Sequence, residues 1–319
     1  MLIALCIILA LILAALLTLV IYIESSLGRL DRVDHVDITK DPLYQQMLEN
    51  GELLETDDSV INILLIGQDR REGEGRQRSD SMILCTVNMH SRTLVMTSFM
   101  RDMYVEIPGY GFNKLNAAYP MGGMELLDKT LLYNFGVVVD ANVEVDFDGF
   151  MSLIDKMNGV DIELTQSEAD YLNRRGNWDV DDSTAWTWSL KEGMNHMTGE
   201  QALAYCRDRF SDKSSDFGRT ERQRKVLMAM LESTKRLSVL EMNGLVQEIL
   251  KMNILTTDMS DNQLITYTKT ILPVLSGLKV VSLRIPADGT WYDDTRDEMS
   301  VLIPDLEKNK ELLAEKIMG

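Results

Sequence analysis

The sequence predicts an α/β fold, a three-layer α/β/α sandwich with a mixed central sheet, preceded by one N-terminal transmembrane helix. Short apolar runs that end at turn residues alternate with helical patterns, as expected for strands and helices packed in layers. Two of the helical patterns end at glycines, where a left-handed cap commonly closes a helix. An uncharged apolar stretch opens the chain and has the composition of a membrane span.

The N-terminal stretch Leu2–Ile23 contains no charged residue. At about 1.5 Å per residue it is long enough to cross a hydrocarbon core of about 30 Å. A cleavable signal peptide would have a basic beginning and a small-residue cleavage site, and neither is clear, so we expect an uncleaved anchor. The predicted organisation is a transmembrane helix at 1–23, a polar stalk at 24–59 with one helix at Pro42–Leu48, and a folded domain at 60–319, with a motif-bearing core at 60–235 and a C-terminal extension at 236–319.

The first predicted strand, Val60–Ile66, is a continuous apolar run closed by Gly67, which is typical of a strand buried on both faces. The runs Ser81–Val87 and Thr93–Phe99 are joined by a short polar stretch and are predicted to form a hairpin. Another strand, Tyr104–Ile107, ends at a Pro-Gly turn.

The rest of the chain is predominantly helical in pattern, and residues 165–190 are less regular. Thr198 is placed to cap the short helix that follows it. The predicted helices are Met124–Asn134, Asp148–Met157, Gly199–Cys206, a long one from Thr220, two more after Leu240 and a final one from Pro304; the predicted strands are Val143–Phe147, Val160–Leu164 and Leu278–Arg284.

The chain is acidic, with a formal net charge of -18 over 319 residues. Such a surface repels nucleic acid, so no nucleic-acid partner is expected and any basic cluster is informative. Cys85 and Cys206 could pair only if the fold brings them together, and we expect instead two small buried side chains. The three cysteines show neither a disulfide framework nor a zinc spacing. The three histidines have no ligand spacing, which argues against a histidine-based metal site.

Arginines gather in three segments that follow predicted strands or adjoin a predicted helix start. The edge of an α/β sheet where strands end is where ligands usually bind. The segments run from Gly67 to Asp80, from Ser98 to Asp102, and from Arg207 to Arg224.

In the third segment, Thr220 and Gln223 match a helix capping box, which would place Arg222 in the first helical turn. The helix dipole disfavours cations there, so the pattern predicts an anionic ligand such as phosphate, which guanidinium groups bind in bidentate fashion. The alternative is a surface salt-bridge network with nearby carboxylates, and the sequence leaves both open.

Asp69 and Asp80 flank the first arginine segment. Mg²⁺ takes a few carboxylate oxygens together with waters and substrate phosphate, so the pair is a candidate metal site. Phosphoryl transfer would follow from such a site, because positioning and charge neutralisation supply most of its catalysis.

At these residues the chain resembles the LytR-CpsA-Psr family of bacterial cell-wall ligases. Six ordered blocks carry the resemblance. They are NILLIGQD at 62–69, RSDSM at 78–82, RDMYVEIPG at 101–109, KLNAAY at 114–119, GEQALAYCRDR at 199–209 and DFGRTERQ at 216–223. Met100 departs from the pattern, because the family usually has proline before the Arg-Asp pair.

The resemblance implies a single-pass protein of the cell membrane whose extracytoplasmic domain transfers a phosphoglycopolymer, such as teichoic acid or capsule, from a polyprenyl-pyrophosphate carrier to peptidoglycan. It implies Mg²⁺ or another divalent cation as cofactor, and membrane lipid, lipid-linked glycan and peptidoglycan as partners. The implied metal ligands are Asp69 and Asp80, the implied pyrophosphate ligands are Arg78, Arg101, Arg207, Arg209, Arg219 and Gln223, and the implied catalytic residues are Arg101, Asp216 and Arg219.

Two other activities use the same residues. A hydrolase would release the lipid-linked group to water, and a non-catalytic regulator of the cell envelope would only bind prenyl phosphates. The sequence also leaves open whether Asp216 supports the arginines or acts as the base.

Overall fold

The computed structural model describes residues 30–54, 57, 59–69, 75–174, 188–211, 215–252 and 254–318. The predicted anchor, Leu2–Ile23, lies outside these residues. Within the described ranges, none of the helices combines the length and apolar character that a membrane crossing requires.

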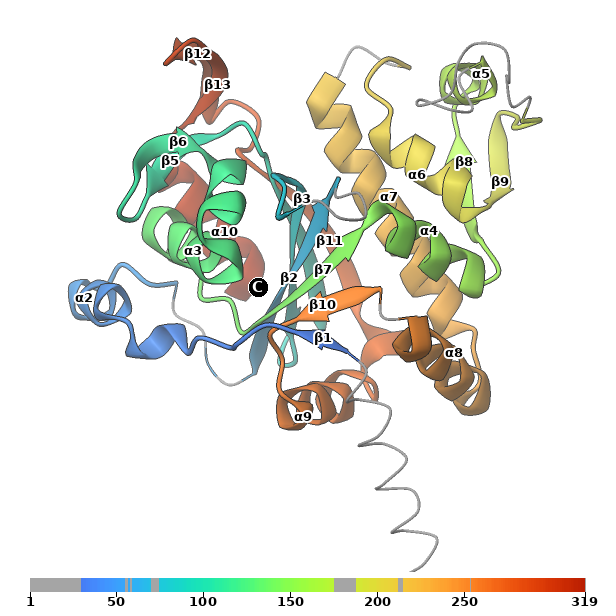
Figure 1. The fold of residues 1–319 in the computed structure, drawn as a ribbon, viewed down its shortest axis with the longest axis horizontal. Coiled ribbons are helices and arrows are strands. Elements are labelled where there is room, and N and C mark those ends of the chain that lie inside the picture. The colour runs from blue at the N-terminus through green and yellow to red at the C-terminus, as the bar shows by residue number, and fades with distance from the viewer. Residues whose placement is uncertain are drawn as a thin grey trace, which may run out of the picture.

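A mixed seven-stranded sheet in the order β1-β10-β7-β2-β3-β4-β11 forms the centre of the fold (Figure 1). The pairs β1/β10, β7/β2 and β4/β11 are parallel and the remaining pairs are antiparallel. The predicted mixed α/β fold is therefore confirmed. The strands are β1 Asp31–Arg32, β2 Val60–Gln68, β3 Ser79–Asn88, β4 Thr93–Phe99, β7 Ala141–Asp146, β10 Leu255–Thr257 and β11 Lys279–Ile285.

Helices flank both faces of this sheet (Figure 1). On one face, α3 and α10 enclose a core that contains the fully buried Leu64 and Ile66 of β2. On the other face, α7 packs Leu227 and Leu231 against β3. The helices are α2 Pro42–Asn50, α3 Ala118–Phe135, α4 Phe147–Lys156, α5 Gln166–Arg174, α6 Gly199–Arg207, α7 Ser215–Lys235, α8 Val239–Met252, α9 Asp261–Ile271 and α10 Leu306–Met318, with short 3-10 turns η1 Ile38–Lys40, η2 Leu115–Ala117 and η3 Leu275–Gly277.

Among the described residues, three small two-stranded sheets lie outside the central sheet. Two are hairpins, β5 Tyr104–Ile107 with β6 Gly111–Lys114 and β12 Trp291–Arg296 with β13 Met299–Pro304. In the third, β8 Val160–Leu164 pairs with β9 Gly193–Met197 across α5; β8 was predicted as a strand, but its partner was not.

Part of the segment predicted as a polar stalk packs on the domain. β1 extends the central sheet beside β10, and Met47 of α2 is buried against Leu132 of α3. The helix α2 begins at Pro42, with Asp41 accepting a hydrogen bond from the Leu43 amide, as expected for an N-cap followed by proline.

Two other local predictions are confirmed. β3 and β4 form the predicted antiparallel hairpin, with Asn88 opposite Thr93. Thr198 caps α6 in a full capping box with Gln201, so the start of the helix that carries Arg207 is fixed by two reciprocal hydrogen bonds. Cys85 and Cys206 are both free thiols packed among apolar side chains.

Candidate active site

Three neighbouring strands bring the first two arginine segments to one edge of the sheet. β2 ends at Gln68, next to Asp69, and the antiparallel β3 begins there, with Gly67 opposite Ser81. A register shift after Gly67 marks an irregularity of the kind that re-aims side chains at sheet edges. Since β4 runs antiparallel to β3, its end carries Arg101 to the same edge.

Arg101 is held by carboxylates from three segments. Its Nη1 donates to Oδ1 of Asp80 at 2.5 Å, its Nε lies 3.3 Å from Asp102, and its Nη2 lies 3.7 Å from Asp216. Burial alone would lower the pKa of Arg101, but the charges of Asp80, Asp216 and Asp102 outweigh it and raise the pKa. This guanidinium is fixed in place rather than free in solvent.

Asp216, in the first turn of α7, joins the remaining arginines. Its Oδ1 lies 3.1 Å from Nε of Arg209 and 3.3 Å from Nε of Arg219. Arg219 is almost fully buried, and burial, together with repulsion from Arg101 and Arg209, lowers its pKa to about 10. Its Nε has no hydrogen-bond partner among the described residues. A buried, incompletely satisfied cation is costly unless an anion approaches it.

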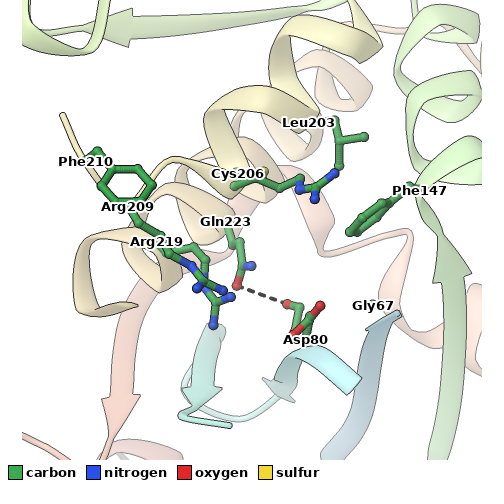
Figure 2. Close-up of a pocket in the computed structure, with 11 residues that line it drawn as sticks. Gly67, Asp80, Phe147, Leu203, Cys206, Arg209, Phe210, Arg219 and Gln223 are labelled. Carbon is green, nitrogen blue, oxygen red and sulfur yellow. Dashed lines mark hydrogen bonds between the residues drawn. The ribbon is translucent and has the colours of Figure 1, made fainter. Parts of the chain in front are cut away.

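Arg207 and Gln223 complete the cluster from α6 and α7. The Arg207 guanidinium stacks on the ring of Phe147 at 4.7 Å, and its Nη2 lies 4.0 Å from Asp69. Gln223 accepts a hydrogen bond of 3.2 Å from the hydroxyl of Ser81, which ties α7 to β3 (Figure 2).

Part of this cluster lines a cavity of about 270 Å³, whereas Arg101, Asp216 and Asp69 lie behind or beside its lining residues. Figure 2 shows Arg209, Arg219 and Gln223 on one side of it, facing Asp80. Apolar side chains of α4 and α6 form the opposite wall. The sequence did not single them out, because apolar residues in a helix carry no local signal of a site. The lining residues are Gly67, Asp80, Ser81, Phe147, Leu203, Cys206, Arg207, Arg209, Phe210, Arg219 and Gln223.

Arg78 is placed differently from the other candidate ligands. It is exposed, next to Ser79 at the start of β3, and it is not part of the cavity wall. Asp102 and Lys114, which sequence reasoning missed as site residues, are instead close: Lys114 Nζ binds Asp102 at 2.6 Å, on the carboxylate that also faces Arg101.

The capping box predicted at Thr220 is wrong, because α7 already begins at Ser215 and Thr220 lies inside it. The Thr220 hydroxyl donates to the Phe217 carbonyl instead. Arg222 is therefore not at a helix start. It is buried and bound by Glu168 at 2.9 Å, so its counter-charge comes from the protein rather than from a ligand. Glu168 lies 54 positions away in sequence, which hid this pairing.

Asp69 and Asp80 remain the candidate metal ligands. Within the described ranges, no group of three or more His, Cys, Asp or Glu side chains forms a complete protein cage for a metal ion. Two aspartates beside a pocket lined by arginines nevertheless fit Mg²⁺, which usually keeps several waters and takes its other oxygens from substrate phosphate. Asp80 is engaged by Arg101, whereas Asp69 is nearly half exposed.

Met100, which stands where proline would be expected, is buried beside the site. Its amide donates to the carbonyl of Ile285 at 2.8 Å and links the Arg101 loop to β11. Proline has no amide hydrogen, so this bond is specific to a non-proline residue here.

The LytR_cpsA_psr family model matches residues 23–315. A transferase of Oceanobacillus iheyensis, polyisoprenyl-teichoic acid–peptidoglycan teichoic acid transferase TagU, is 30% identical over 86% of this chain and 83% of its own. Regulatory protein MsrR of Staphylococcus aureus is 38% identical over 54% of this chain and 49% of its own. A solved structure of YwtF (TagT) with bound octaprenyl pyrophosphate lipid is 26% identical, with a TM-score of 0.61 over 83% of this chain and 94% of that one.

Proposed function

The chain belongs to the LytR-CpsA-Psr family, and from this membership we propose that it transfers a phosphoglycopolymer, such as teichoic acid, from a polyprenyl-pyrophosphate carrier to peptidoglycan. The observation that carries the proposal is the cavity, in which the buried Arg219 and the half-buried Arg207 and Arg209 lie beside apolar side chains. Arg207, Arg209 and Arg219 would bind the pyrophosphate, and Phe147 and Leu203 would meet the first carbons of the lipid.

The proposed reaction breaks the phosphoanhydride bond of the pyrophosphate and forms a phosphodiester with the acceptor. An acceptor hydroxyl forms a P–O bond to the phosphorus that carries the glycan, the P–O bond to the prenyl phosphate breaks, and prenyl monophosphate leaves. The hydroxyl proton passes to a carboxylate or water at the site. Bound Mg²⁺, held by Asp69 and Asp80, would neutralise charge on the phosphate oxygens.

Within this reaction, we assign Arg101 and Arg219 to the phosphate oxygens. Asp216 faces guanidinium groups with both of its carboxylate oxygens, towards Arg209 and Arg219 on one side and Arg101 on the other. Such a carboxylate orients arginines better than it accepts a proton. We therefore favour the supporting role of Asp216 over the role of general base. Arg78, exposed outside the cavity, could reach the substrate only at its entrance.

The sheet face away from α3 offers a place for the lipid tail. On the α3 side the residues of β2 are fully buried, whereas Ile63 and Leu65 on the other side are only half-buried. On that face Gly67 of the cavity lies opposite Val145, and Leu65 lies opposite Val143. Val143 lines a second cavity of about 480 Å³, walled by apolar side chains of α8, α9 and β10. Leu65 and Val143 thus lie side by side on the sheet face between the two cavities.

The proposal includes a location. The stretch Leu2–Ile23 would anchor the chain in the cell membrane as a single span, with the three-layer catalytic domain on the extracytoplasmic side, where lipid-linked glycan and peptidoglycan meet.

A transfer assay tests the reaction class. The full chain in detergent is given a synthetic polyprenyl-pyrophosphate glycan and a peptidoglycan acceptor, with Mg²⁺ or with chelator. Polymer-linked product that needs acceptor and metal supports the transferase. Release of the glycan to water with or without acceptor would make the chain a hydrolase, and tight lipid binding without turnover would make it a regulator, as one relative is named.

A further inference from the structure

Aromatic and charged side chains share one face of the β5–β6 hairpin, where Phe112 is exposed and Tyr104, Glu106 and Lys114 are partly buried. Tyr104 and Phe112 stack with their ring centroids 5.6 Å apart and their planes within 23°. Phe112 is 58% exposed although it lies in a regular strand. Contiguous apolar surface marks interaction sites where single exposed residues do not, and here the Phe112 ring continues into that of Tyr104. We call Lys114, Tyr104, Phe112 and Glu106 the hairpin strip.

The four residues face the same way. Tyr104 is opposite Lys114 and Glu106 is opposite Phe112, and residues two apart on a strand share a face. Both ends of the strip are polar. Lys114 binds Asp102 at one end, and the Tyr133 hydroxyl donates to Glu106 at 3.2 Å at the other.

The strip begins at the active site. One carboxylate, Asp102, contacts both Arg101 of the site and Lys114 of the strip. Tyr104 is paired across the hairpin with Lys114. Its ring therefore lies next to the residue that binds Asp102, which in turn contacts Arg101 of the arginine cluster. The tip of the β12–β13 hairpin supports this arrangement, because Asp297 accepts a hydrogen bond of 3.0 Å from the Tyr104 hydroxyl.

We propose that the hairpin strip binds the acceptor, a glycan strand of peptidoglycan, next to the site of transfer; this inference rests on the proposed transferase function. A pyranose ring has a face of C–H groups that packs on aromatic rings and a rim of hydroxyls that bond to carboxylates and amines. Tyr104 and Phe112 offer the first kind of contact, and Glu106 and Lys114 the second.

The geometry of transfer selects the acceptor rather than the donor for this surface. Attacking and leaving oxygens lie roughly in line across the phosphorus. The apolar wall of the cavity, where the prenyl phosphate would leave, comes from Phe147, Leu203 and Cys206, whereas the strip adjoins the arginines through Arg101 and Asp102. An acceptor on the strip therefore approaches from the side away from the leaving group.

A membrane is a poor occupant of the same surface. In Figure 1 the β5–β6 and β12–β13 hairpins lie at the top of the view, while β1, the first described strand after the predicted anchor, lies near the bottom. The hairpin that carries the strip thus lies at the opposite end of the view from β1.

The test uses the full chain in detergent and, as probe, a soluble peptidoglycan tetrasaccharide without cross-links. We expect Phe112→Ala and Tyr104→Ala to weaken binding of this probe, measured by calorimetry without donor, by roughly three- to tenfold each. In the transfer assay, the KM for acceptor should rise by a similar factor while the KM for the lipid-linked donor stays unchanged. Phe112→Ser serves as a second variant, because an exposed position tolerates a polar side chain.

Tyr292→Ala is the matched control, since Tyr292 is also 58% exposed but lies on β12. The proposal is overturned if the strip variants bind the tetrasaccharide as the unsubstituted chain does, if Tyr292→Ala weakens binding equally, or if loss of Phe112 changes only self-association. Because binding is measured without donor, a chain that binds the glycan through the strip yet transfers nothing would refute the transferase and leave the strip standing.

Discussion

Arg219 is expected to weaken the fold while serving the site. Burial and the neighbouring arginines lower its pKa from the usual value of an arginine to about 10. One pKa unit corresponds to about 1.4 kcal/mol, so holding this charge costs up to about 3 kcal/mol in the absence of ligand. Arg219→Met keeps most of the volume and removes the charge. Asp216 loses one arginine contact but keeps those with Arg101 and Arg209, so we expect a net gain in unfolding free energy of about 1–2 kcal/mol.

Arg222→Met on the same helix is the control. Arg222 is equally buried, but Glu168 and Asp208 face its Nε at 2.9 and 3.7 Å. Its removal leaves two buried carboxylates without a counter-charge, which should cost about 3–5 kcal/mol. The two variants therefore change stability in opposite directions although the residues are three positions apart.

Denaturant unfolding of the full chain in detergent measures both changes. Because the pKa of Arg219 in the fold lies below that in the unfolded chain, the cost is fully present below about pH 10 and disappears only as the pH rises through that range. The gain from Arg219→Met should thus be constant at neutral pH, while transfer activity is lost. Destabilisation by Arg219→Met comparable to that by Arg222→Met would refute this reasoning.

Three further predictions concern other parts of the molecule. Val143→Trp should fill the cavity between β7 and α8 and weaken binding of a long prenyl pyrophosphate by roughly tenfold, leaving a geranyl pyrophosphate unaffected; equal loss for both would place the tail elsewhere. Burial raises the pKa of Asp128, so the contribution of this residue to stability is greatest at low pH and falls as the pH rises above 3.8. The variant Asp128→Asn should therefore be more stable than the unsubstituted chain by about 1 kcal/mol or more at pH 7 but not at pH 4. Urea unfolding at the two pH values measures the difference. Asp69→Asn should raise the Mg²⁺ concentration for half-maximal transfer without changing thermal unfolding, because Asp69 is nearly half exposed; an unchanged requirement would remove it as a ligand.

Strands and helices whose pattern is local could be predicted from the sequence. Thr93–Phe99 and Val160–Leu164 have the same limits in the structure as in the prediction, since continuous or alternating apolar runs of that length have few other uses. β12 escaped prediction because its sequence WYDDTR is largely polar and is stabilised mainly by pairing with β13. β1 has only two residues and pairs with a strand more than two hundred positions away.

The same distinction holds for the site, where residues with a local chemical signal could be predicted and residues without one could not. Arg101 and Arg219 could be found because clusters of arginines are informative in an acidic chain, and both residues lie in such clusters. The start of α7 was misplaced because Thr220 and Gln223 imitate a capping box, while the true first turn contains Asp216, the residue that organises the arginines. Phe147 and Leu203 have no chemical signal at all. They become part of the site only because α4 and α6 fold onto the same sheet edge.

The position of Asp216 explains how one helix can carry both a structural and a ligand-binding arginine. The negative charge lies in the first turn of α7, where the helix dipole favours it. It holds Arg219 one turn further on at the cavity, whereas Arg222, three residues later, is neutralised by Glu168 and Asp208. The protein therefore supplies the full counter-charge for Arg222 but only a shared carboxylate for Arg219. An anionic substrate would supply the counter-charge for Arg219 that the shared carboxylate of Asp216 provides only in part.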